Sequence, residues 1–209
     1  MQVILDHFPQ ITAEQQAQFA QLDELYRLWN ARINVISRKD IDHLYTHHVL
    51  HSLAIAKFVQ FKPEAQIVDL GTGGGFPGIP LAILFPEVSF TLIDGTRKKI
   101  SVVEAVAEGL GLTNVRPLAV RAEEHKGQYD FVVTRAVAEM SMLARWSAHL
   151  VQHKRQLHAL PNGLIALKGG QVKQEVKGLP RKMSVETEPI STWFKDPWFE
   201  EKYVVWAQV

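Results

Sequence analysis

The chain has 209 residues, of which 46% are hydrophobic and 22% are charged, so it can bury one sizeable core. It contains no cysteine, which excludes disulfides, thiolate zinc sites and catalysis by a cysteine nucleophile. The formal net charge is only +1, so any nucleic-acid contact must rest on a local concentration of basic residues.

Residues 1–62 predict helices rather than strands. Thr12 followed by Gln15 resembles a capping box, in which two side chains bond to each other's backbone where a helix begins. Apolar residues then recur at helical spacing, first at Phe19, Leu22, Tyr26 and Trp29 and more loosely at Ile41, Leu44, His48 and Ile55. We expect residues 1–62 to form a helical extension packed on the core.

The N-terminal residues carry Asp6, His7 and Pro9, where a signal peptide would need an uninterrupted apolar stretch. No segment approaches the length of apolar sequence that spans a bilayer. The expected location is therefore the cytoplasm, with no membrane partner.

After Pro63, short apolar runs alternate with helical stretches. Each run predicts a fully buried strand, and the runs are Ile67–Leu70, Phe90–Ile93, Val115–Leu118, Phe131–Val133 and Leu164–Leu167. The stretches between them predict helices over Ile79–Phe85, Lys98–Gly109 and Met140–Leu150. This alternation favours an α/β domain, residues 63–209, with a mostly parallel, doubly wound sheet. The tail differs, since Met183–Ile190 and Tyr203–Gln208 alternate like an antiparallel hairpin.

A glycine-rich segment, Asp69 to Gly78, follows the first predicted strand and precedes a helix. Glycines there let the backbone turn tightly and approach a ligand that a Cβ atom would obstruct. Gly73, Gly75 and Gly78 match the G-x-G-x-x-G pattern of dinucleotide sites. Asp69 with Gly71, Gly73 and Gly75 matches the acid-x-G-x-G-x-G signature of class I methyltransferases.

Two carboxylates bear on the choice of ligand. Asp69 stands where an anion suits the cationic amino-acid end of S-adenosylmethionine, whereas a pyrophosphate has no electrostatic use for it. Asp94 ends the second predicted strand, 19 residues after Gly75, where a carboxylate can accept both ribose hydroxyls of either ligand. The segment therefore indicates a nucleoside ligand, with S-adenosylmethionine favoured over NAD.

Further candidates follow the third and fourth predicted strands, at the sheet edge where ligands bind in this architecture. Ala122 is small enough to leave a slot for an adenine ring, and Glu123 could accept a bond from an exocyclic amine. Taken alone, Glu123 and Glu124 are explained as well by a surface acid pair. Arg135 could serve a ligand or a salt bridge equally.

Basic residues concentrate in one part of the chain. Between Lys154 and Lys182 there are seven Lys or Arg residues against one acid, Glu175, so this window carries a net +6 and the rest of the chain −5. Such a patch suits phosphate contact, and a solvated lysine-rich surface explains it equally.

Three histidines, His43, His47 and His51, lie at successive i, i+4 steps, which could align them on one helix face as metal ligands. The sequence offers no evident fourth ligand and no cysteine, so we expect no metal. Plain packing of the rings, or contact of partly protonated rings with RNA phosphates, accounts for the series as well.

Taken together, the residues from Trp29 to Gly169 resemble the bacterial 16S ribosomal RNA guanine-N7 methyltransferase family, known as RsmG or glucose-inhibited division protein B. The most specific matches are Asp69 through Leu81, Arg121-Ala122-Glu123, Arg135-Ala136 and Leu167-Lys168-Gly169. Trp29-Asn30 and Asn34-Val35-Ile36-Ser37 look like a variant of the family's upstream segment. Where the family usually reads Arg-His-Ile-Leu-Asp-Ser, this chain has His47-His48-Val49-Leu50-His51-Ser52, so histidine replaces both charged partners.

The resemblance implies a Rossmann-like class I S-adenosylmethionine-dependent methyltransferase fold. It also implies that Gly71, Phe76, Ala122, Glu123 and Arg135 contact S-adenosylmethionine and that the product is 7-methylguanosine in small-subunit RNA. The glycine-rich segment adds Asp69, Gly73 and Gly75 as cofactor contacts, and the end of the second strand adds Asp94. The candidates for RNA contact are His48, Arg121, Lys168 and Lys173.

Guanine N7 has an in-plane lone pair and no proton, so its methylation needs no general base, and we expect catalysis by positioning alone. The lack of cysteine argues against methylation of pyrimidine C5, and the lack of an Asn/Asp-Pro-Pro-aromatic motif argues against methylation of an exocyclic amine. We expect the protein to be a monomer. Its expected partner is 16S ribosomal RNA or the small ribosomal subunit. The alternatives are an NAD-dependent oxidoreductase and a non-catalytic RNA-binding module on the same fold.

Overall fold

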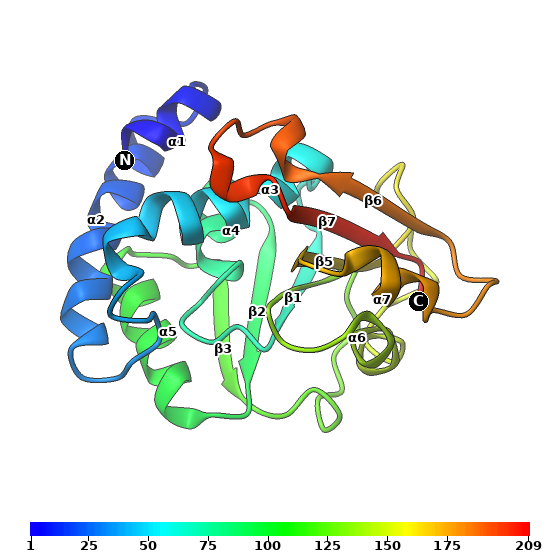
Figure 1. Ribbon diagram of the computed structural model, residues 1–209. Helices are drawn as coiled ribbons and strands as arrows, with labels where there is room; N and C mark the ends of the chain where they lie inside the picture. Colours follow the sequence, from blue (N-terminus) through cyan, green and yellow to red (C-terminus); the bar gives the residue numbers. More distant parts are fainter.

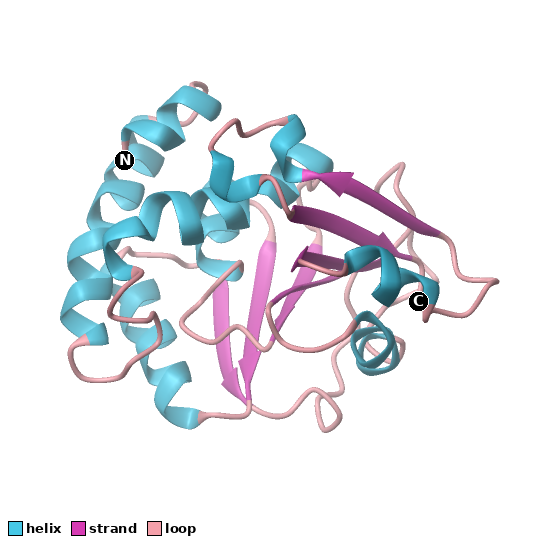
Figure 2. Ribbon diagram, in the orientation of Figure 1, coloured by secondary structure: helices cyan, strands magenta, loops and turns pink.

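The computed structural model describes residues 1–209 and places seven strands in one sheet between two layers of helices (Figures 1 and 2). The strand order is β3-β2-β1-β4-β5-β7-β6, and neighbouring strands are parallel except where β7 pairs with β5 and β6. The strands are β1 (Gln66–Leu70), β2 (Ser89–Asp94), β3 (Val115–Ala119), β4 (Phe131–Arg135), β5 (Gly163–Gly169), β6 (Val185–Pro189) and β7 (Lys202–Ala207). The predicted α/β class, the parallel core and all seven strands are confirmed.

The helices fall into an N-terminal group and a set of crossover connections. The N-terminal group is α1 (Gln2–His7), α2 (Ala13–Asn30), the short η1 (Ile41–His43), η2 (Leu44–Leu50) and α3 (His51–Phe58). The connections are α4 (Gly78–Leu84), α5 (Arg97–Gly109), α6 (Met140–Ser147) and α7 (Val172–Lys177), with the short turns η3 (Ile190–Thr192) and η4 (Pro197–Phe199) before β7. No helix combines the length and apolarity needed to cross a bilayer.

Alternate residues of each strand point to opposite faces of the sheet, and each face has its own core. Ile67, Phe90 and Phe131 belong to a cluster of 40 buried residues, which the N-terminal helices, α4 and α5 cover. Val68 and Val132 belong to a cluster of 16 on the other face, covered by α6 and α7 (Figure 1). The smaller cluster leaves the face near the β3–β4 connection thinly covered, because that connection contains no helix.

One predicted strand differs in burial. The sequence predicts that β3 is fully buried, and this is wrong, because all five of its residues are partly or fully exposed. β3 lies at the edge of the sheet, where only one neighbour covers it. Pro117, which has no N–H to donate, is tolerated at such an edge.

The C-terminal hairpin is confirmed, with an arrangement that the sequence does not predict. β7 pairs antiparallel with both β5 and β6, so the last strand inserts between them. Leu164 to Leu167, the apolar run of β5, is thereby covered on both sides by neighbouring strands.

The N-terminal extension packs directly on the sheet, since the larger cluster runs from Ile4 to Trp206. The predicted capping box is present, and the Nε2 of Gln15 also donates to the carbonyl oxygens of Ile83 and Leu84 at the end of α4. The domain boundary at residue 62 stays a prediction.

The loose helical pattern after Ile41 has a structural cause. Leu44–Leu50 forms a π-helix, which continues into α3. A π-helix makes i→i+5 hydrogen bonds, so apolar residues drift out of the 3.6-residue period there, and such segments are rare and frequent at functional sites.

Candidate active site

Asp69 fixes the glycine-rich loop after β1 through hydrogen bonds. One carboxylate oxygen accepts from the hydroxyl of Thr72 at 2.6 Å and from the backbone N–H of Gly78 at 2.8 Å. Asp69 is fully buried, and this burial raises the pKa of its carboxyl to about 7 despite those two bonds. Its side chain therefore fixes the shape of the loop, and direct contact with a ligand's amino group stays a prediction.

Three of the loop glycines have positive φ, at +70° for Gly71, +58° for Gly73 and +105° for Gly75. A Cβ at Gly75 would meet Ile79 at 2.7 Å, and one at Gly71 would meet Val137 at 2.6 Å. At Gly73 a Cβ would meet nothing within 4 Å. The backbone of Gly73 thus faces open space, as a cradle for a ligand requires.

Beside this loop lies a cavity of about 240 Å³, here called the glycine-loop pocket. It brings together Gly71, Asp94, Arg121, Ala122 and Glu123, which come from the carboxyl ends of β1, β2 and β3 and the turns that follow them. These turns meet because the carboxyl ends of parallel strands share one edge of the sheet. Four of the predicted cofactor residues and one predicted RNA residue, Arg121, therefore share a single cavity.

Asp94 is tied to the loop it faces. One of its oxygens accepts from the N–H of Gly73 at 3.1 Å and the other from the N–H of Thr96 at 2.8 Å. The ammonium of Lys99 lies 3.8 Å from the same carboxylate. These contacts hold the carboxylate in place at the pocket wall.

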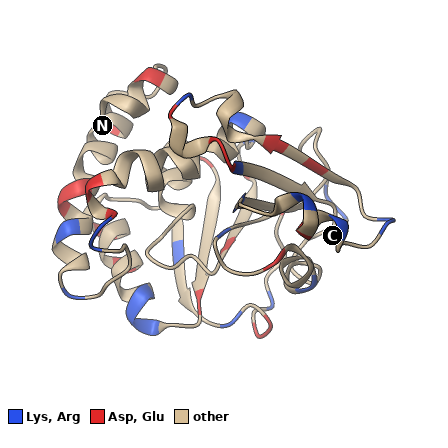
Figure 3. Ribbon diagram, in the orientation of Figure 1, with Lys and Arg blue, Asp and Glu red and all other residues tan.

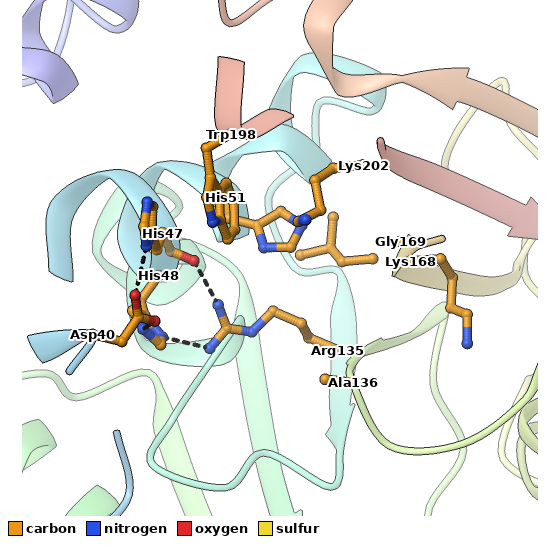
Figure 4. A pocket seen from close by; sticks show the side chains of 11 residues that line it. Asp40, His47, His48, His51, Arg135, Ala136, Lys168, Gly169, Trp198 and Lys202 are labelled. Carbon is orange, nitrogen blue, oxygen red and sulfur yellow. Dashed lines mark hydrogen bonds and ion pairs between the residues drawn. The ribbon is translucent and has the colours of Figure 1, made fainter. Parts of the chain in front are cut away.

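Arg135, at the end of β4, lies across a second cavity. Its guanidinium donates to the carbonyl oxygen of His47 at 3.1 Å and to Nδ1 of His48 at 3.0 Å (Figure 4). It also lies 5.0 Å from the centre of the Phe76 ring. Burial lowers the pKa of Arg135 to about 10, which leaves it charged at neutral pH. Its other N–H groups make no hydrogen bond within the protein.

Asp40 completes this network. Its two oxygens lie 2.6 Å from Nδ1 of His47 and 2.6 Å from Nε2 of His48. Burial would raise the pKa of Asp40, but the hydrogen bonds from both rings outweigh burial and lower it. Since Arg135 can only donate, His48 must accept at Nδ1 and carry its proton on Nε2.

His48 is therefore a neutral link rather than a cation. Burial and the charge of Arg135 lower the pKa of His48 to about 4. Both of its nitrogens are engaged, one with Arg135 and one with Asp40. The predicted contact of His48 with RNA stays a prediction, and at neutral pH the ring has no charge to offer a phosphate.

The second cavity, here called the histidine pocket, has a volume of about 450 Å³. Asp40, His48 and Arg135 line one side, and His51, Trp198 and Lys202 line another (Figure 4). The ring of Trp198 stacks on His47 with centroids 4.2 Å apart, and the ammonium of Lys202 lies 4.5 Å from the centre of the same ring. A volume of this size lies within the range of small-ligand pockets, about 300–1,000 Å³.

No group of three or more His, Asp or Glu residues lies close enough together to hold a metal ion. His43 and His47 stack on each other instead, with centroids 4.5 Å apart. The histidine series thus takes part in stacking and hydrogen bonding.

The comparisons with known proteins bear on this site. Residues 15–195 match the family model described as GidB, rRNA small subunit methyltransferase G. The chain belongs to this family.

Two relatives, each named ribosomal RNA small subunit methyltransferase G, illustrate the match. The one from Bacteroides thetaiotaomicron is 52% identical over 209 residues, covering 100% of both chains. The one from Porphyromonas gingivalis is 52% identical over 205 residues, covering 98% of this chain and 92% of the relative. The GidB assignment favours a methyltransferase over the NAD-dependent oxidoreductase and the non-catalytic module.

Solved structures agree on the fold. Aeropyrum pernix fibrillarin, solved with natively bound S-adenosyl-L-methionine, has a TM-score of 0.55 and 11% identity, covering 76% of this chain and 74% of its own. The precorrin-6y C5,15-methyltransferase from Geobacter metallireducens has a TM-score of 0.56 and 9% identity, covering 84% of this chain and 91% of its own. The predicted class I methyltransferase fold of this GidB chain is confirmed.

Two other predicted site residues of the GidB chain, Phe76 and Lys168, make contacts that the sequence did not indicate. The ring of Phe76 is buried, 4.8 Å from the centre of Tyr26 and 5.3 Å from that of His48, so any contact with the cofactor would be through its backbone. Lys168 pairs with Glu175 at 2.7 Å and donates to the carbonyl of Ala138 at 2.9 Å, so its ammonium anchors the loop after β4 to α7.

The basic window is divided by the fold. Lys154 and Arg155 precede β5, and Lys168 lies near the carboxyl end of this strand. The length of β5 therefore separates Lys168 from Lys154 and Arg155. Lys173 lies on α7, beside a cavity of about 740 Å³ against β6 and β7. Figure 3 shows basic segments scattered over helices, strands and loops instead of one gathered patch.

Several site residues were missed. Asp40, Trp198 and Lys202 belong to no motif, and Asp40 lies in a polar stretch that gives no sign of its role. Trp198 lies in η4, between the two strands of the predicted hairpin, where no pattern marks it. Asn30, noted for its resemblance alone, bonds to the backbone of Val35 and Ile36 and so places Val35 against Gly74.

Proposed function

We propose that this protein transfers a methyl group from S-adenosylmethionine to N7 of a guanine in 16S ribosomal RNA. The observation that carries the proposal is the match of residues 15–195 to the rRNA small subunit methyltransferase G family. The open cradle at Gly73, with a carboxylate at Asp94 beside it, supports a nucleoside cofactor.

The residues present fit the cofactor. Gly71, Gly73 and Gly75 would approach it with their backbones, while Asp94 would accept from its ribose and Ala122 and Glu123 would flank its adenine. Arg135, with N–H groups that no protein atom accepts, would meet its carboxylate. When bound, S-adenosylmethionine supplies a methyl group on a positively charged sulfur.

The chain's own contribution is positioning. N7 carries no proton, so no side chain has to remove one, and His48 has no free nitrogen with which to do so. Asp69 fixes the loop, and Asp40 fixes Arg135 through His48. Holding two reactants in register can lower a barrier by about 7–11 kcal/mol, so positioning suffices without acid–base chemistry.

RNA contact is proposed for His48, Arg121, Lys168 and Lys173. Lys173, exposed on α7, is the best placed of these for a phosphate, since Lys168 is already paired with Glu175. Arg121 borders the glycine-loop pocket and would contact RNA only near the cofactor. We place the reaction in the cytoplasm, carried out by a monomer on ribosomal RNA or the small subunit.

The test is mass spectrometry of ribosomal RNA nucleosides from cells with and without the gene. Loss of one 7-methylguanosine from small-subunit RNA is expected in the deletion, and purified protein with S-adenosylmethionine should restore it in vitro. An unchanged nucleoside profile would contradict the proposal. Sedimentation analysis of the purified protein tests the monomer.

A further inference from the structure

His51 is a buried side chain with an unused hydrogen-bonding atom. Only 6% of the residue is exposed, and its Nε2 has no partner. The backbone of His47 favours a proton on this ring, and because Nε2 has no partner, we assign the proton to Nδ1, which leaves Nε2 as an acceptor.

An unsatisfied buried acceptor is costly, by about 1–3 kcal/mol, and it calls for a physical reason. His51 lines the histidine pocket, where Trp198 meets its ring edge to face at 5.1 Å. A ligand that offers an N–H from within this pocket would satisfy Nε2.

The pocket also offers donors and an aromatic wall. The N–H groups of Arg135 that no protein atom accepts and the ammonium of Lys202 line the same cavity as Nε2. Donors beside an acceptor match the Watson–Crick edge of guanine, where the N1–H donor is next to the O6 acceptor. Adenine would present the lone pair of its N1 to the lone pair of Nε2.

The position of the pocket fits the chemistry at N7. Ala136 lines the histidine pocket and the next residue, Val137, lines the glycine-loop pocket, so the two cavities are neighbours. In Figure 4, His51 and Trp198 lie on one side of the Arg135 side chain and Ala136 on the other. A base whose N7 faces the Ala136 side turns its Watson–Crick edge toward His51.

We propose that the histidine pocket receives the target guanine and that Nε2 of His51 accepts a hydrogen bond from N1–H of the base. This rests on the proposed function, since it takes guanine as the substrate. His51 is then a specificity-determining residue, which selects a base with a proton on N1.

The test combines two protein variants with three RNAs. His51→Leu removes the acceptor, and His51→Gln keeps one at similar reach. The RNAs are 16S transcripts in which the target nucleotide, located by mass spectrometry, is guanosine, inosine or 2-aminopurine riboside, introduced by ligation of a synthetic segment. Inosine retains N1–H and O6, and 2-aminopurine lacks both.

We expect His51→Leu to lower kcat/KM on the guanosine RNA about 10- to 100-fold, with most of the loss recovered in His51→Gln. Affinity for S-adenosylhomocysteine, measured by calorimetry, should be unchanged. The melting temperature of His51→Leu should change little, because the substitution removes a buried acceptor that has no partner in the protein.

A binding readout without turnover decides the assignment. With S-adenosylhomocysteine bound, the native protein should bind the guanosine and inosine RNAs alike and the 2-aminopurine RNA about fivefold or more weakly. His51→Leu should discriminate less strongly against the 2-aminopurine RNA, and what remains should reflect the missing O6. Undiminished discrimination by His51→Leu would overturn the role of His51 alone, whereas absence of 7-methylguanosine with the native protein would overturn the proposed function as well.

Discussion

The glycine-loop pocket and the histidine pocket are neighbours, yet they are assembled in different ways. The first is formed mainly by turns after three successive strands, between Leu70 and Glu123, and each turn carries its own recognisable residue pattern. The second draws Asp40, Arg135 and Lys202 together from distant parts of the chain. The proposed cofactor pocket thus depends on local motifs, and the other pocket depends on tertiary packing around a π-helix.

The largest effect is expected at the glycine loop. Gly73→Val places a side chain in the open space of the cradle, and we expect affinity for S-adenosylhomocysteine to fall about 100-fold or more with the fold retained. Calorimetry measures the affinity, and circular dichroism checks the fold.

Gly111→Val is the matched control for that variant. Gly111 also has positive φ, +65°, and a Cβ there also meets nothing within 4 Å, but it lies after α5 and lines neither pocket. Equal losses in both variants would mean that backbone strain, not ligand space, explains the result.

The second effect tests whether Asp40 acts through Arg135. Arg135→Met should lower kcat/KM about 30-fold or more, and Asp40→Asn about 3- to 10-fold, because the latter only loosens His48 and the guanidinium it holds. The double variant should be no worse than Arg135→Met alone. Additive losses would show that Asp40 acts independently.

A third effect concerns stability and pH. Folding raises the pKa of Asp69 to about 7, so its contribution to stability is fully present below about pH 4 and is lost as pH rises through about 7. Asp69→Asn keeps an acceptor for Thr72 and Gly78 without the charge. Its melting temperature relative to the native protein should therefore rise between pH 5 and pH 8, by about 5–10 °C. A constant difference across that range would contradict the raised pKa.

The smallest effect is expected on the outer surface. Lys173→Ala should weaken RNA binding about two- to fivefold and reduce the salt dependence by about one counterion, since it removes one phosphate contact. Lys154→Ala, before β5 and hence at the other edge of the sheet, is the control and should change neither quantity. Equal losses in both variants would indicate non-specific attraction.

The contrast between local motifs and tertiary packing also explains which parts of the fold could be predicted from the sequence. The parallel strands are short apolar runs, so residues such as Ile67 and Phe131 mark them without knowledge of their neighbours. The exposure of β3 and the insertion of β7 depend on strand order, which a local pattern does not contain.

The residues of the candidate site also fall into those that the sequence could predict and those that it could not. Gly71, Asp94, Ala122 and Glu123 could be predicted to converge, because strand ends share an edge. Asp40 could not, because its role exists only once the π-helix brings His47 and His48 within 2.6 Å of its carboxylate. The ion pair of Lys168 could not be predicted either. Its positive charge suggested contact with RNA, whereas its partner Glu175, seven residues further along the chain, reaches it only in the folded structure.

The carbonyl oxygen of His47 accepts from the guanidinium of Arg135, and His51 follows His47 by four residues in the same run of helix. A ligand that draws the guanidinium toward itself competes with this carbonyl oxygen, next to the histidine pocket that His51 lines. Occupancy of one cavity then alters affinity at the other, and linkage requires the same factor in both directions.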